Sequence, residues 1–100
     1  MKIIAETASN HMGEIDYLKE ITDKCFEYGA DMVTVQIFDL DSFVSKYDEY
    51  HSNFKNICFE IRDWENYLSW AMKKGYDILP CVLDNKSLDL LRKMKFNKIK

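Results

Sequence analysis

The sequence has no long run of apolar residues. Its longest apolar runs are about five residues, whereas a helix that spans a bilayer needs roughly 20. The N-terminal segment reaches the carboxylate of Glu6 too early to form the apolar core of a signal peptide. The sequence therefore predicts neither a membrane span nor a secretory leader.

Paired cysteines, basic clusters and linkers are also absent. Cys25, Cys58 and Cys81 show no CxxC spacing, and an odd number without metal-binding spacing is typical of reduced thiols in a cytoplasm. Lys and Arg are scattered along a chain of formal net charge −3, which gives no basic stripe for nucleic acid or an anionic membrane. No low-complexity segment divides the 100 residues. We therefore expect one cytoplasmic domain without a nucleic-acid or membrane partner.

What the sequence does contain is a repeated unit. Gly29-Ala30-Asp31 and Gly75-Tyr76-Asp77 each follow a helical pattern of apolar residues and precede an apolar run. A Gly just beyond a helix end can take the left-handed conformation that caps the last turn. The apolar run after it is typical of a buried strand. This repetition of helix, cap, short loop and strand indicates the βα units of a parallel sheet.

The apolar periodicities predict an α/β fold. The expected strands cover residues 2–6, 31–38, 77–82 and 96–100, and the expected helices cover 14–28, 61–74 and 85–94. Asp84 is placed to cap the last helix. The connection 39–60 is longer than ordinary loops, and that length is typical of a functional segment such as a lid.

Two architectures fit these elements. Four parallel strands with helices on one side cannot close a barrel, so the first expectation is that residues 1–100 are the N-terminal half of a (β/α)₈ TIM barrel. A four-stranded flavodoxin-like sandwich is the alternative. Strand order separates the two, because the sandwich places the first strand centrally with helices on both faces.

Strand 31–38 alternates strictly between apolar and polar residues. Val33, Val35 and Ile37 are expected to face the helices, while Thr34 and Gln36 point toward the barrel axis. Inward polar side chains near the carboxyl end of a barrel strand are candidates for a binding pocket.

The segment from Ile4 to Glu14 contains an apolar strand, a Glu, three residues, and then Asn-His-x-Gly with an acidic residue. This motif resembles the opening of the sialic acid synthase family, which includes N-acetylneuraminate, legionaminate and pseudaminate synthases. The resemblance continues without a gap through the Gly29 cap, the strand with Gln36, Phe43–Tyr47, Trp64 and the Lys74-Gly75 cap to Lys100. Each piece is weak alone, and the ordered set identifies the family.

The resemblance implies a full-length homodimeric enzyme with a TIM barrel and a small C-terminal antifreeze-like domain. It implies that phosphoenolpyruvate condenses with an N-acylated hexosamine, an amino sugar, to form a nonulosonic (sialic-type) acid. A divalent metal, Mn²⁺ or Mg²⁺, assists in the family, and its His ligands lie later in the sequence, so no metal ligand is expected in this chain. Such a reaction needs cations or N–H donors for the enol phosphate and a base to activate water.

Five residues match functional positions of the family. Glu6 corresponds to an active-site Glu and is the expected catalytic residue. Asn10 and His11 correspond to a pair beside the substrate pocket. Gln36 matches a sugar-contacting Gln, and Lys100 matches a Lys that contacts phosphoenolpyruvate. Without the resemblance these residues have plainer interpretations: a surface charge at a strand end, a loop that caps a helix, and a solvated lysine.

Two positions depart from the family. Thr34 stands where the family has a Lys that contacts phosphoenolpyruvate, and Cys81 replaces a hydroxyl that helps to hold the phosphate. The missing cation is expected to weaken phosphoenolpyruvate binding. We interpret Cys81 as a buried thiol, because the sequence places no base beside it. Three functions therefore stay open: the synthase, a divergent non-catalytic sugar-binding or regulatory homologue, and a related barrel with another acceptor or anion.

Overall fold

The computed structural model describes residues 1–100. Its elements in chain order are β1 (Ile4–Glu6), α1 (Ile15–Glu27), β2 (Met32–Ile37), α2 (Leu40–Phe43), α3 (His51–Ile57), α4 (Ile61–Lys73), β3 (Ile78–Val82) and α5 (Asn85–Lys93). Each element predicted between residues 2 and 94 lies within two residues of its expected bounds. No helix combines the length and the apolar character that crossing a bilayer would require.

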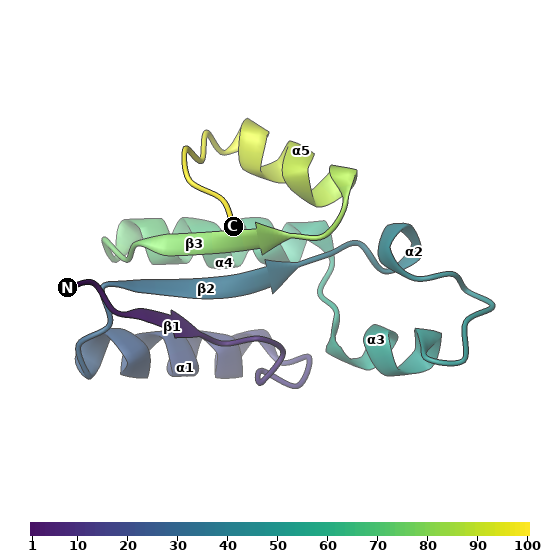
Figure 1. The fold of residues 1–100 in the computed structure, drawn as a ribbon, viewed down its shortest axis with the longest axis horizontal. Coiled ribbons are helices and arrows are strands. Elements are labelled where there is room, and N and C mark those ends of the chain that lie inside the picture. The colour runs from purple at the N-terminus through teal and green to yellow at the C-terminus, as the bar shows by residue number, and fades with distance from the viewer.

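The three strands form one parallel sheet in the order β1-β2-β3. Glu6 of β1 lies opposite Thr34 of β2, and Thr34 lies opposite Leu79 of β3. β1 occupies an edge of the sheet, and α4 lies behind β2 and β3 (Figure 1). A flavodoxin-like sheet would place β1 between its neighbours. That alternative is therefore wrong, and the order is that of consecutive βα units.

The core lies on one side of the sheet. Val33, Val35 and Ile37 are fully buried in a cluster with side chains of α1, α4 and α5, which confirms the predicted alternation of β2. Trp64 and Tyr67 of α4 are the largest fully buried side chains of this core. Burying a large apolar side chain contributes about 1.5–3 kcal/mol. This one-sided core holds the helices on the sheet and leaves the opposite face for a site.

The helix ends follow the predicted pattern. Gly29 and Gly75 have φ values of 101° and 76°, and the N–H groups of the residues after them donate to Cys25 O and Ala71 O at 3.0 Å. Only Gly takes this left-handed conformation without strain. Asp84 caps α5, as predicted, by accepting a hydrogen bond of 2.8 Å from the Ser87 N–H.

Two expectations about organisation are not met. Residues 96–100 form no strand. The Lys100 N–H donates to Pro80 O at 2.8 Å, but a single hydrogen bond does not make a ladder with β3. The connection 39–60 is not one loop, because it contains α2 and α3. These helices have four and seven residues, which is too short for a helical period to stand out in the sequence.

Candidate functional site

The face of the sheet opposite the core carries a pocket of about 400 Å³. Five side chains line it: Ile4, Glu6, Thr34, Leu79 and Lys100. The strand residues meet there because successive side chains point to opposite faces, and these positions alternate with the core residues of their strands. Two predicted site residues, Glu6 and Lys100, are thus brought together with Thr34, one of the positions that departs from the family.

An ion pair crosses this pocket. Lys100 Nζ donates to Glu6 Oε2 at 2.8 Å, and the Ala8 N–H donates to Glu6 Oε1 at 3.1 Å. The Lys100 hydrogen bond lowers the pKa of Glu6 below its ordinary value, with smaller contributions from the Thr34 hydroxyl and Ala8, while Glu6 raises the pKa of Lys100. Lys98 pairs instead with Asp77 at 2.9 Å. Lys98 and Lys100 are separated by one residue, and of the two only Lys100 lines the pocket.

The Ala8 contact fixes the Glu6 carboxylate in the loop that follows β1. Ala8 reaches it in a left-handed conformation with φ of 48°, which costs a residue with a Cβ roughly 1–2 kcal/mol. Thr7 anchors the same loop, since its hydroxyl donates to Thr34 O at 2.7 Å. Glu6 is thus held from the backbone side as well as by Lys100.

Thr34 carries an unpartnered polar group beneath the ion pair. The residue is 2% exposed, and its hydroxyl is buried with no hydrogen-bond partner. It lies close enough to the Glu6 carboxylate to lower the pKa of that group, but not in the geometry of a hydrogen bond. A buried hydroxyl without a partner is uncommon in folded proteins and calls for a reason.

Gln36 and Cys81 lie opposite each other one step further along the sheet. Gln36 shares the parity of Thr34 and is half-buried, so it is on the inward face as expected. Cys81 is also half-buried, which is more exposed than the buried thiol that we expected. Both side chains are next to the pocket but do not line it.

Asn10 and His11, in the loop after β1, lie in different environments. Asn10 is exposed and makes no side-chain hydrogen bond to Glu6 or Lys100. His11 is 2% exposed, with its ring 4.5 Å from that of Phe59 and 6.3 Å from that of Trp64. His11 Nδ1 accepts a hydrogen bond from the Gly13 N–H at 3.0 Å. This side chain joins the first loop to α4 and does not line the pocket.

Burial lowers the pKa of His11 below its ordinary value of 6.5. A group whose pKa is lowered in the folded state adds stability above its unfolded pKa and loses it as the pH falls. We therefore expect the free energy of unfolding to fall as the pH drops below about 6.5, before the carboxylates titrate. Urea unfolding between pH 5 and 8 measures this loss, and it should be absent in His11→Asn, which keeps an acceptor near Nδ1 but does not titrate. An equally steep loss in that variant would contradict the assignment.

The Asn-His-x-Gly turn also holds the segment 39–60. Gly13 has a φ of 78° and lies so close to Asn56 that a Cβ on Gly13 would clash with the Asn56 carbonyl oxygen. Phe43 and Phe54 of this segment pack edge-to-face, with ring centroids 5.2 Å apart. The segment projects beyond the carboxyl ends of the strands (Figure 1). Whether it acts as a lid stays a prediction. The Asn-His-x-Gly motif points to Gly13, but nothing in the sequence predicts that Gly13 packs against Asn56.

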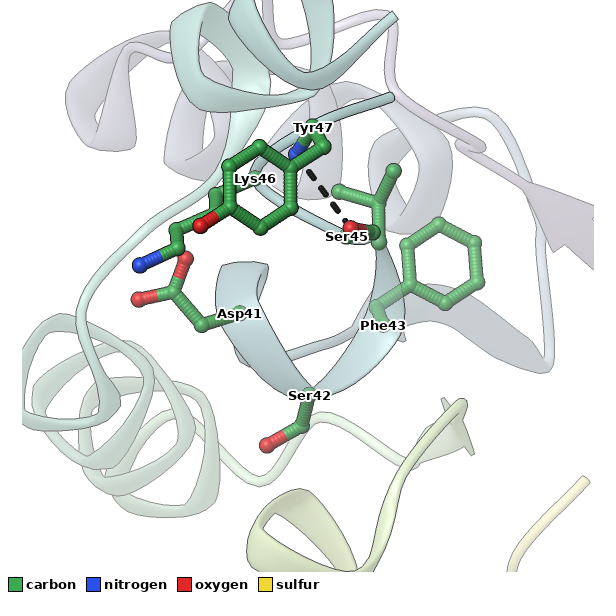
Figure 2. A pocket seen from close by; sticks show the side chains of 7 residues that line it. Asp41, Ser42, Phe43, Ser45, Lys46 and Tyr47 are labelled. Atoms are coloured by element: carbon green, nitrogen blue, oxygen red, sulfur yellow. Dashed lines mark hydrogen bonds between the residues drawn. The ribbon is translucent and has the colours of Figure 1, made fainter.

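Another pocket, of about 500 Å³, lies within this projecting segment. Figure 2 shows the side chains of Asp41, Lys46 and Tyr47 on one side of it and Phe43 on the other. The Tyr47 N–H donates to Ser45 Oγ at 3.2 Å. All of its lining comes from residues 41–47, which are mostly exposed, and no predicted site residue lies there. We therefore place the site at Glu6 and Lys100.

The carboxylates at the ends of β2 and β3 serve the fold. Asp84 Oδ2 accepts from the Asp39 N–H at 2.7 Å, and Asp39 Oδ2 accepts from Ser42 and Lys86. Each Asp caps the helix that follows it. No group of three or more His, Cys, Asp or Glu side chains is arranged to hold a metal ion. The residues of this chain therefore do not fit the divalent metal of the family.

Curated proteins with similar sequences extend far beyond this chain. An uncharacterised protein of Methanocaldococcus jannaschii is 35% identical over 92 residues, which cover 92% of this chain and 27% of that protein. The N,N'-diacetyllegionaminic acid synthase of Legionella pneumophila is 29% identical over 112 residues, covering 98% of the chain and 32% of the synthase. The chain thus spans about a third or less of these relatives. No family model matches it.

Solved structures agree on the fold. The N-acetylneuraminic acid (sialic acid) synthetase of Leptospira borgpetersenii superposes with a TM-score of 0.79 at 20% identity, covering 92% of this chain and 32% of that one. The spore coat polysaccharide biosynthesis protein spsE of Bacillus subtilis superposes with a TM-score of 0.67 at 29% identity, covering 94% and 27%. The three-stranded parallel sheet with its helices therefore matches part of these proteins. With the ordered motifs and the legionaminic acid synthase match, the chain is similar in sequence and fold to part of the sialic acid synthase family.

Proposed function

We propose that this chain is part of a synthase that condenses phosphoenolpyruvate with an N-acylated hexosamine to form a nonulosonic acid. The observation that carries the proposal is the pocket in which Glu6, Thr34 and Lys100 meet. Two named relatives support the product class, since they are called a legionaminic acid synthase and a sialic acid synthetase. We also propose that the complete protein is cytoplasmic and homodimeric.

The chemistry assigns roles to the two charged residues. Lys100 would hold the phosphoryl group of phosphoenolpyruvate through a charge-assisted hydrogen bond. Glu6 is ionised at neutral pH, since Lys100, Thr34 and Ala8 lower its pKa further below an ordinary value of 4.5, and a carboxylate beside the ligand can take a proton from an attacking water. Gln36 would contact the sugar from its position on β2, two residues beyond Thr34. The divalent metal enters the proposal only at the level of the family, and no step is assigned to it.

The test is an assay of phosphate release in the complete protein that carries these residues. We expect inorganic phosphate to be released only when phosphoenolpyruvate, an N-acylated hexosamine and Mn²⁺ are all present. The 100 residues alone should release none, because they form a three-stranded sheet with an open face. Release without the sugar would indicate a phosphatase and contradict the proposal.

A non-catalytic sugar-binding or regulatory homologue is the second candidate. It is favoured by Thr34 and Cys81, which stand at positions where a phosphate-binding Lys and hydroxyl are expected, and by the neutral sum of the charges of Glu6 and Lys100. The same assay separates the two functions. A protein that binds the N-acylated hexosamine in calorimetry but releases no phosphate would belong to the second class.

A further inference from the structure

Lys100 is the single cation that lines the pocket, and it is already engaged. Its ammonium contacts Glu6 at 2.8 Å, so the pocket offers an incoming anion no free positive charge. Both partners are accessible, however, with exposed side-chain fractions of 55% for Lys100 and 43% for Glu6. Ion pairs with this exposure contribute little to stability and are readily broken.

We propose that Lys100 is exchanged between Glu6 and a phosphoryl oxygen of the ligand, so that ligand binding releases Glu6 Oε2 into the pocket. The inference rests on the proposed function, because it requires a phosphorylated ligand at this site. It couples the two residues, because Lys100, which binds the ligand, is also the group that holds the base Glu6.

The geometry of Glu6 allows this exchange. Its two oxygens have different partners, Lys100 on Oε2 and the Ala8 N–H on Oε1. When Lys100 leaves, the Ala8 hydrogen bond keeps the carboxylate in position and only Oε2 becomes free. The flexible four-carbon stem of a lysine permits such a movement, and a phosphate dianion attracts an ammonium more strongly than a carboxylate does.

Thr34 supports an oxygen ligand at the same place. Its buried hydroxyl lines the pocket and lacks a hydrogen-bond partner. A phosphoryl oxygen that takes Lys100 from Glu6 would arrive beside this donor and satisfy it. The departure of Lys100 also removes the largest influence that lowers the pKa of Glu6. Glu6 then becomes a stronger base after the ligand has bound.

The experiment is a double-mutant cycle read by calorimetric titration with inorganic phosphate at constant ionic strength. Glu6→Gln removes the competitor, so phosphate should bind about three- to tenfold more tightly than to the wild type. Lys100→Met removes the cation, so phosphate should bind at least about tenfold more weakly. The double variant should gain less from Glu6→Gln than the wild type does, because without Lys100 only the repulsion between Glu6 and phosphate is removed and no lysine is released.

The controls separate exchange from a general effect of charge. Asp77→Asn removes the same charge from the partner of Lys98 and should leave phosphate affinity unchanged, and melting curves show that each variant is folded. A gain from Glu6→Gln that is equally large with and without Lys100 would overturn the exchange, because it would reflect only the removal of a negative charge. Equal phosphate affinity in the wild type and Glu6→Gln would also overturn it, while the phosphate site of the proposed function would stand. If no variant binds phosphate, both proposals fail.

Discussion

Replacing Gly13 with Ala is expected to lower the free energy of unfolding by about 2–4 kcal/mol. Two costs add at this residue. Its φ of 78° lies in the left-handed region, and a Cβ would clash with the Asn56 carbonyl oxygen. That oxygen belongs to backbone, which cannot move aside without displacing the end of α3. Urea unfolding followed by circular dichroism at pH 7.5 measures the loss.

Gly75 offers a matched control for this prediction. Its φ of 76° is nearly the same, but no atom lies within 4 Å of the position of a Cβ. Gly75→Ala should therefore cost only the conformational part, about 1 kcal/mol. The difference between the two variants isolates the packing of segment 39–60 on the first loop. Equal losses would mean that this segment does not pack against Gly13 in solution.

The predictable part of the fold rests on local patterns. Val33, Val35 and Ile37 alternate with polar residues, and that period alone decides which face of β2 meets the helices. The caps at Gly29 and Gly75 are likewise local, because the conformation of one residue ends each helix. For these features the structure adds distances to what the sequence already predicts.

The unpredicted parts depend on contacts between distant residues. The ring of His11 is buried because Phe59 and Trp64, about 50 residues later, fold over it, and no spacing near His11 signals this. Strand formation at residues 96–100 requires a ladder with β3, and an apolar pattern alone does not supply one. The α2 and α3 helices are too short for their period to be detected.

The candidate site shows the same division. The resemblance to the family predicts that Glu6 and Lys100 are functional residues, and the parity of β2 predicts that Gln36 lies on the inward face. It does not indicate that Glu6 and Lys100, 94 residues apart, pair with each other. Nor does it indicate that Thr34 leaves a buried hydroxyl unpartnered between them. The ion pair makes the charges of the side chains that line the pocket sum to zero.

Replacing Glu6 with Gln is expected to lower kcat for phosphate release by about 100- to 10,000-fold. Gln has nearly the same shape, and its side-chain oxygen can still accept the Ala8 N–H, but it cannot take a proton from water. The KM for phosphoenolpyruvate should stay the same or fall, because Lys100 is no longer held by a carboxylate. A loss of kcat without a rise in KM is the mark of a group used only in the transition state.

Glu20→Gln is the control for this variant, since Glu20 is an exposed carboxylate on α1 and should leave both constants unchanged. Steady-state phosphate release in the complete protein gives the two constants, and thermal melting checks folding. A rise in KM with kcat unchanged would assign Glu6 to substrate binding instead of proton transfer. Unchanged kcat and KM would remove Glu6 from the reaction altogether. In that case the contact with Lys100 would be an exposed surface ion pair between the segment after α5 and the end of β1.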